Sequence, residues 1–168
     1  MRRTVRARLV VPLLLVPLAA LFVTSCAEQR KKEVTDVVKQ YLDYELSQDY
    51  LHQHGLIDAE SAKALPLPTK VLTNPFNPKK MTDYQLNEVT IEGATARAQV
   101  HATFQLSWAG GAGVPEGYDL NIYVVHQPGE WKVDEIRTRK AALNQVLGQG
   151  QGDNWLLIQQ QKKQFDGQ

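Results

Sequence analysis

Three residues near the end of the first amphipathic segment, Glu45, Asp49 and His52, have side chains suited to acid–base chemistry. On a helical wheel of about 100° per residue they fall on or beside the apolar face that leads up to them. Carboxylates held among apolar side chains have raised pKa values, as acid–base catalysis requires. Their oxygen and nitrogen atoms also suit a metal ion. If one helix carries all three, they form a candidate pocket.

The element that would position this trio is an amphipathic helix. Its apolar side chains recur at the i, i+3, i+4 spacing of one helical face, and they are Val34, Val37, Val38, Tyr41, Leu42 and Leu46. Two outcomes stay open at its end: the helix continues to His52 and directs the trio inward, or it ends near Ser47-Gln48 at a solvated surface. No nucleophile motif, Walker sequence, dinucleotide fingerprint or cysteine–histidine metal spacing is present, so we expect no cofactor or metal and assign no catalytic residue.

The chain's single cysteine lies at the end of the run Val23-Thr24-Ser25-Cys26. An arginine-rich start, residues 2–8, and an apolar run, residues 9–23, precede it in the order typical of a secretory signal peptide. The run resembles a bacterial lipobox, in which an aliphatic residue and two small residues precede a cysteine that receives diacylglycerol. The resemblance implies cleavage before Cys26 and a lipid-anchored protein on the extracytoplasmic side of a bacterial membrane.

A transmembrane helix is the alternative interpretation of this segment. The apolar run is shorter than the ~20 residues that a bilayer span needs, and Pro12 and Pro17 interrupt it. The whole chain has a formal net charge of +1, and every charged residue of segment 1–25 is an arginine, so the remainder is net acidic. That balance argues against nucleic acid as a partner. We expect membrane attachment through the lipid on Cys26 instead.

Alternating residues indicate a sheet in the second half of the chain. From residue 94 to 108, apolar side chains occupy one parity and polar side chains the other, as in a long strand with one buried face. Further strands are predicted over 86–91, 118–125 and 131–136, joined by turns into an antiparallel arrangement. The apolar helix face needs a partner and the sheet supplies it. The predicted class is α+β, with a long N-terminal helix and a short second one on a curved antiparallel sheet of about four strands.

The remaining segments complete the predicted organisation. Asp58 reads as the N-cap of the short second helix, and prolines make residues 66–80 a loop. Residues 144–168 shift toward Gln and Gly and form either a docked helix or a partner-binding tail. The predicted organisation is a signal peptide over 1–25, a tether over 26–32, one domain over 33–143 and the Gln-rich tail over 144–168.

The order of these elements, together with the run Gly129-Glu130-Trp131-Lys132-Val133-Asp134, resembles the nuclear transport factor two-like superfamily. In that run, Trp131 and Val133 are predicted to point inward, and Lys132 and Asp134 to face water. The resemblance implies a cone whose interior can serve as a pocket. A cystatin-like helix on a sheet is the second architecture that fits. The carboxylate and tyrosine of the superfamily's steroid isomerases have no position-by-position match here.

Three functions are expected, in descending order. The first is a non-enzymatic domain of the cell envelope that binds a protein partner or a small ligand. The second is a small-molecule pocket enzyme of the isomerase or hydrolase kind that uses Glu45, Asp49 and His52. The third is a structural subunit, such as a homodimer, formed through the polar strand face, whose residues are Arg97, Gln99, His101 and Thr103.

Overall fold

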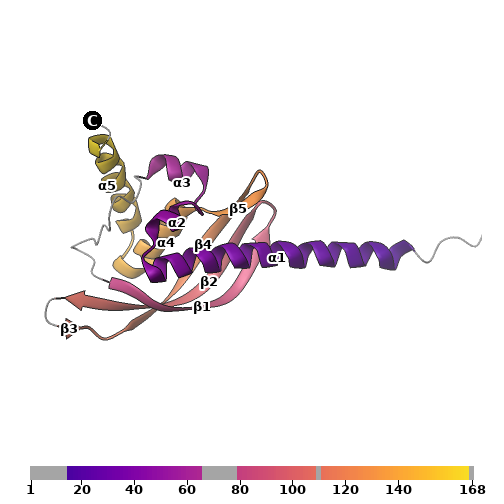
Figure 1. Cartoon of the computed structure of the whole chain (residues 1–168), viewed down its shortest axis with the longest axis horizontal. Helices are drawn as coiled ribbons and strands as arrows, with labels where there is room; N and C mark the ends of the chain where they lie inside the picture. The colour runs from indigo at the N-terminus through magenta and orange to yellow at the C-terminus, as the bar shows by residue number, and fades with distance from the viewer. Residues whose placement is uncertain (1–14, 66–78, 109–110, 167–168) are drawn as a thin grey trace, which may run out of the picture. The chain divides into compact units, whose positions relative to one another are not determined.

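The computed structural model describes residues 15–65, 79–108 and 111–166 (Figure 1). The chain divides into two compact units, Met1–Arg30 and Lys31–Gln168. The sheet and its covering helices belong to the second unit. The elements are α1 (Leu15–Ser47), α2 (Tyr50–His54), α3 (Ala59–Ala64), β1 (Lys79–Glu92), β2 (Thr95–Trp108), β3 (Gly111–Ala112), β4 (Glu116–Gln127), β5 (Glu130–Val133), α4 (Glu135–Leu147) and α5 (Gln151–Asp166).

The strands form an antiparallel sheet in the order β1-β2-β4-β5, with the short β3 paired to β2. The register of β1 on β2 shifts between Met81 and Asp83 and again between Leu86 and Glu88. Such irregularities bend a strand and increase its twist, which helps a sheet to curve. The predicted α+β class, a long N-terminal helix and short helix with a curved antiparallel sheet, is confirmed.

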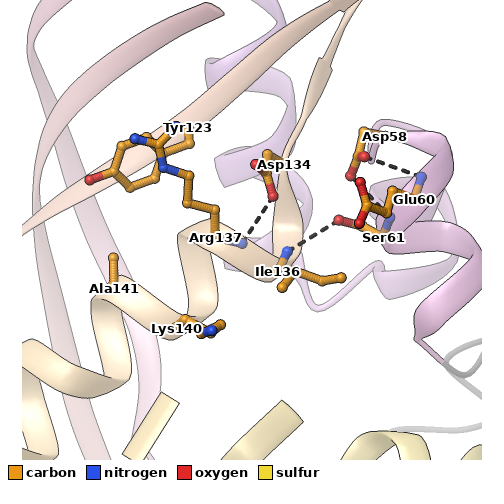
Figure 2. A pocket seen from close by; sticks show the side chains of 9 residues that line it. All are labelled: Asp58, Glu60, Ser61, Tyr123, Asp134, Ile136, Arg137, Lys140 and Ala141. Carbon is orange, nitrogen blue, oxygen red and sulfur yellow. Dashed lines mark hydrogen bonds between the residues drawn. The ribbon is translucent and has the colours of Figure 1, made fainter. Parts of the chain in front are cut away.

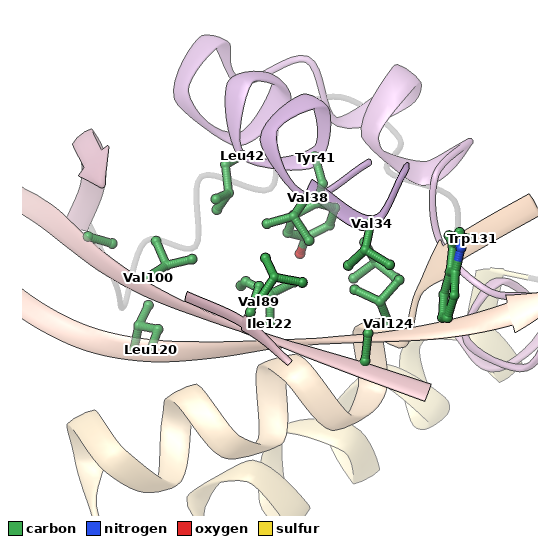
Figure 3. Packing of buried hydrophobic residues seen from close by; sticks show 14 of the residues in the cluster. Val34, Val38, Tyr41, Leu42, Val89, Val100, Leu120, Ile122, Val124 and Trp131 are labelled. Atoms are coloured by element: carbon green, nitrogen blue, oxygen red, sulfur yellow. The ribbon is translucent and has the colours of Figure 1, made fainter. Parts of the chain in front are cut away.

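The core lies between α1 and one face of the sheet, and Figure 3 shows side chains from both sides pointing toward one another. Val34 and Val38 of α1 are fully buried at 0% exposure, as the helical spacing predicts. Burial of a valine side chain contributes about 1.5–3 kcal/mol. The even-numbered residues of β2 and β4 supply the opposite face of the core, and they are Ala96, Ala98, Val100, Ala102, Leu120, Ile122 and Val124.

The first long helix ends at Ser47, the second of the two outcomes left open by the sequence. Gln48 has a positive φ of 58°, a left-handed conformation that interrupts a right-handed helix. Asp49 then caps α2, its side chain accepting a hydrogen bond from the backbone N–H of His52. The trio therefore does not share one helix.

The segment after β5 differs from the prediction. The strand predicted over 131–136 ends at Val133, and α4 begins at Glu135 because the Asp134 side chain caps its first turn by accepting from the N–H of Arg137. Trp131 and Val133 are buried as predicted, but Lys132 is only partly exposed and donates to the Gly55 carbonyl oxygen. Asp134 likewise serves as a cap instead of simply facing water.

Residues 66–78 of the predicted proline-rich loop lie outside the described residues, and its last two residues begin β1. Asp58 caps α3 as predicted. Residue 144, where the tail was expected to begin, lies inside α4, and most of the tail forms α5. Gly152 is buried against α4, where a Cβ atom would come within 2.5 Å of the Lys140 carbonyl oxygen. The absence of a side chain there permits close packing of α5 on α4.

Two segments cover the edge of the sheet that ends at β4 and β5. Val133 pairs through its backbone with Leu56 and Asp58, so the α2–α3 connection covers β5. Since β5 pairs only with residues 124–127 of β4, the rest of that edge is covered by α4, where Thr138 Oγ1 accepts from the Tyr123 N–H at 3.0 Å. These edge contacts bring α3, β4 and α4 together around a hollow.

Candidate functional site

The predicted pocket residues are divided between two places. Glu45 points from α1 toward α4, and its carboxylate binds Arg139 and Gln53. Asp49 and His52 pair with each other at 2.6 Å between Oδ2 and Nδ1, and the His52 side chain is 66% exposed. The His52 ring also stacks on Tyr44. Glu45 is therefore separated in its interactions from the other two residues of the trio.

Glu45 belongs to a set of side chains that we call the ion-pair cluster, consisting of Tyr41, Glu45, Gln53, Glu135 and Arg139. Arg139 lies between two carboxylates, with Nη2 at 2.7 Å from Glu45 Oε2 and Nε at 2.7 Å from Glu135 Oε1. The Tyr41 hydroxyl donates to the other oxygen of Glu135. The Gln53 amide donates to Glu45 at 2.7 Å and to the Tyr41 carbonyl oxygen at 3.2 Å. The cluster thus connects α1, α2 and α4.

The pKa values of the cluster follow from burial and from these contacts. Burial opposes ionisation of Glu45, but the Arg139 guanidinium and the Gln53 amide outweigh it and hold the pKa of Glu45 below its ordinary value. Burial raises the pKa of the Tyr41 phenol well above its ordinary value, and the neighbouring carboxylates add to that shift. Tyr41 therefore stays a neutral hydrogen-bond donor, Glu45 stays charged, and the cluster is a set of mutually satisfied groups.

A second group of charged side chains lines a hollow of about 440 Å³ between α3, β4 and the start of α4, which we call the α3–α4 pocket. Figure 2 shows its lining, which consists of Asp58, Glu60, Ser61, Tyr123, Asp134, Ile136, Arg137, Lys140 and Ala141. Its volume lies within the roughly 300–1,000 Å³ of small-molecule sites. The pocket is therefore the right size for a small ligand or a peptide end.

Two helix starts and one buried hydroxyl hold the walls of the α3–α4 pocket in place. Asp58 caps α3 by accepting from the N–H groups of Glu60 and Ser61, both at 3.2 Å. Ser61 is 1% exposed, and its Oγ accepts from the Ile136 N–H at 3.2 Å, which joins α3 to α4. Asp134 accepts from the Arg137 N–H at 2.9 Å. Both oxygens of Asp58 thus accept backbone N–H groups, whereas the backbone bond of Asp134 engages only Oδ1.

The charges of the α3–α4 pocket are arranged unevenly. Burial raises the pKa of Asp134, and the negative charges of Asp58 and Glu60 raise it further against the opposing effect of Arg137. The Arg137 guanidinium lies 4.0 Å from the centre of the Tyr123 ring, a cation–π contact. Lys140 pairs with Asp153 of α5. Carboxylates that repel one another and an aromatic-stacked arginine therefore line the same hollow.

Sequence reasoning missed both partners of Glu45 and the whole lining that α4 contributes. One signal for α4 was present: Asp134 followed by Glu135, then Gly148 after thirteen helical residues, is an N-cap, an acidic first turn and a glycine stop. The alternation Trp131-Lys132-Val133 instead favoured a strand that continues through the start of α4. The pairing of Glu45 with Arg139 had no local signal, because the two residues are 94 positions apart.

The other predicted functional residues lie apart from both sites. Cys26 is an exposed free thiol in α1. On the polar strand face, Arg97 and His101 are exposed, and His101 pairs with Asp119 at 2.7 Å. Across the part of the chain that the structure describes, no three His, Cys, Asp or Glu side chains gather closely enough to hold a metal ion. No helix of the described ranges is long and apolar enough to cross a membrane.

Comparison with known proteins adds no family to this description. No protein-family model matches the chain, and no curated protein matches its sequence. The function proposed below therefore depends on the residues and their geometry.

Proposed function

We propose that this protein is a lipid-anchored, extracytoplasmic envelope protein of a bacterium whose folded domain binds a small ligand or a partner without catalysing a reaction. The anchoring part rests on the lipobox-like run that ends in Cys26. The binding part rests on one observation, the α3–α4 pocket, where Asp134, Arg137 and their neighbours surround an open hollow. A pocket enzyme that uses Glu45 is less favoured, because Arg139 and Gln53 already engage its carboxylate.

Native mass spectrometry of the full-length protein, extracted from its own membranes in mild detergent, tests both parts. We expect the mass of a chain that begins at Cys26 and carries diacylglycerol, and beside it a form with a bound small molecule or polypeptide. A chain that retains residues 1–25, or one without an acyl group, would contradict the anchoring part.

Cys26→Ser provides the matched test in cells. Because serine cannot receive the thioether-linked lipid, we expect the variant to lose stable attachment and to fail to be processed as a lipoprotein. Fractionation of membranes after a high-salt wash measures this, with Ser25→Ala as a control that keeps the cysteine. Equal membrane retention of wild type and Cys26→Ser would remove lipid anchoring from the proposal.

A further inference from the structure

We propose that the α3–α4 pocket binds a small zwitterion, an amino acid or short peptide that carries a free ammonium group and a carboxylate. This deepens the proposed function and rests on it, since it names the ligand of the same pocket. The side chains divide into an acidic wall and a cationic end, and each matches one charged group of such a ligand.

The acidic wall consists of Asp58, Glu60 and Asp134, which come from the start of α3 and the residue before α4. Within the described residues, the partners of the Asp58 and Asp134 carboxylates are backbone N–H groups, and neither carboxylate forms an ion pair. Burial raises the pKa of Asp134, and the negative charges of Asp58 and Glu60 add to that shift. An ammonium group supplies three N–H donors and a positive charge, which this wall lacks.

The cationic end is the Arg137 guanidinium, which Tyr123 holds by stacking at 4.0 Å. Guanidinium presents a planar set of donors that suits a carboxylate in a two-point contact. Lys140, the other cation of the lining, is already paired with Asp153. Arg137 is exposed and forms no ion pair in the described part of the chain, so it is the group that meets the ligand's carboxylate.

The remaining lining suits a short ligand with a small side chain. Ile136 and Ala141 are the apolar members of the lining, and Ser61 joins α3 to α4 through its bond to the Ile136 N–H. Figure 2 shows Arg137 and Tyr123 on one side of the hollow and Asp58 and Glu60 on the other. A ligand with separated positive and negative ends can therefore contact both at once.

Isothermal titration of the full-length protein in mild detergent with L-alanyl-L-alanine tests this assignment. We expect saturable binding that falls about tenfold or more in Asp134→Asn. Asparagine also caps helices, so this change removes the charge and keeps the start of α4. N-acetyl-alanyl-alanine should show the same loss with the wild-type protein. Asp83→Asn, an exposed residue on β1, is the matched control and should bind like wild type.

The carboxylate contact has its own test. Arg137→Gln should weaken the binding of alanyl-alanine by a similar factor. It should leave the affinity for alanyl-alanine amide, which is already weaker, unchanged, because that probe has no carboxylate for Arg137 to bind. Arg97→Gln on β2 is the control. Free alanine and tetra-alanine distinguish an amino acid from a longer peptide as the ligand. The pocket volume favours the short probes. Tighter binding of tetra-alanine would indicate that a peptide segment supplies the same two charged groups.

Two results would overturn the assignment: no binding of any of these probes at millimolar concentration, or binding that acetylation, Asp134→Asn and Arg137→Gln all leave unchanged. Neither result bears on the acyl group at Cys26 or on a co-purifying polypeptide. A failure of the zwitterion assignment is therefore distinguishable from a failure of the lipoprotein proposal, which the mass of the native protein and the Cys26→Ser fractionation decide separately.

Discussion

The ion-pair cluster and the α3–α4 pocket lie on two faces of the same helix, and they treat charge in opposite ways. Glu135 and Arg139, four residues apart on α4, turn toward α1 and find partners for their charges there. Asp134 and Arg137, at the start of the same helix, line the pocket and form no ion pair in the described part of the chain. Removing one partner of a buried ion pair is costly because it leaves the other charge uncompensated, whereas charges held without ion-pair partners are available to a ligand.

The largest effect is expected where the paired charges depend on one residue. Arg139→Leu leaves the carboxylates of Glu45 and Glu135 without a cation in a mostly buried place, and we expect it to lower the free energy of unfolding by about 2–4 kcal/mol. Urea denaturation measures this through the midpoint. Arg137→Leu, on the pocket face, should change stability by less than about 0.5 kcal/mol. Equal losses in the two variants would contradict the division between the two faces.

The next effect concerns the contact that holds the pocket wall to α4. Ser61→Ala removes the acceptor of the Ile136 N–H and leaves that donor unsatisfied in a partly buried position, which costs about 1 kcal/mol. We expect a lower urea midpoint and faster hydrogen exchange at the Ile136 amide. Ser47→Ala, at the exposed end of α1, is the control. An Ile136 amide that stays protected in Ser61→Ala would show that this bond does not hold α3 to α4.

The two regions should change stability with pH in opposite directions, because the pKa of Glu45 is lowered and that of Asp134 is raised. The pKa of Glu45 is lowered in the folded protein, so its contribution is present above its ordinary pKa and is lost as the pH falls through the folded-state value. Glu45→Gln should therefore be less stable than wild type at neutral pH, and the difference should shrink in acid. Urea midpoints at pH 7, 5 and 3 measure this. A difference that stays constant over the series would contradict the ionic role of Glu45.

The smallest effect has the opposite direction. The pKa of Asp134 is raised in the folded protein, so its charge is unfavourable above the folded-state value, and that cost disappears as the pH falls toward the ordinary pKa. Asp134→Asn keeps the cap and removes the charge, so it should stabilise the protein by a few tenths of a kcal/mol at neutral pH. The gain should vanish near pH 3. If the Asp134 charge is repelled by its neighbours, Asp134→Asn should raise the free energy of unfolding. If Asp134 only supports the fold, the substitution should lower it.

The sequence predicted the regions where periodicity is a local property. Val34, Val38 and the alternating residues of β2 all lie in the core, because a helix face and a strand face are set by neighbours in the chain. The same pattern misled after Val133: the predicted strand continued to residue 136, three residues too far, although the side chain of Asp134 caps the start of α4 there. Strand and helix patterns overlap at this junction, and the capping hydrogen bond of Asp134 favours the helix.

The candidate sites were harder to predict, since they depend on contacts between distant residues. Glu45 was found as a polar residue on an apolar face, but its partner Arg139 belongs to a helix that the strand pattern concealed. The positive φ of Gln48 separates Glu45 from Asp49 and His52, and no residue type there requires it. The α3–α4 pocket brings together the starts of two helices and an edge of β4, a juxtaposition that only the assembled sheet creates.

The most direct test of the division between paired and unpaired charges on α4 is the urea midpoint of Asp134→Asn, measured at neutral pH beside its affinity for alanyl-alanine. We expect the midpoint to rise slightly while the affinity falls about tenfold, because the Asp134 charge opposes folding and is proposed to bind the ligand's ammonium group. A midpoint that falls together with an unchanged affinity would contradict it, and would place Asp134 with the ion-pair cluster as a residue that only supports the fold.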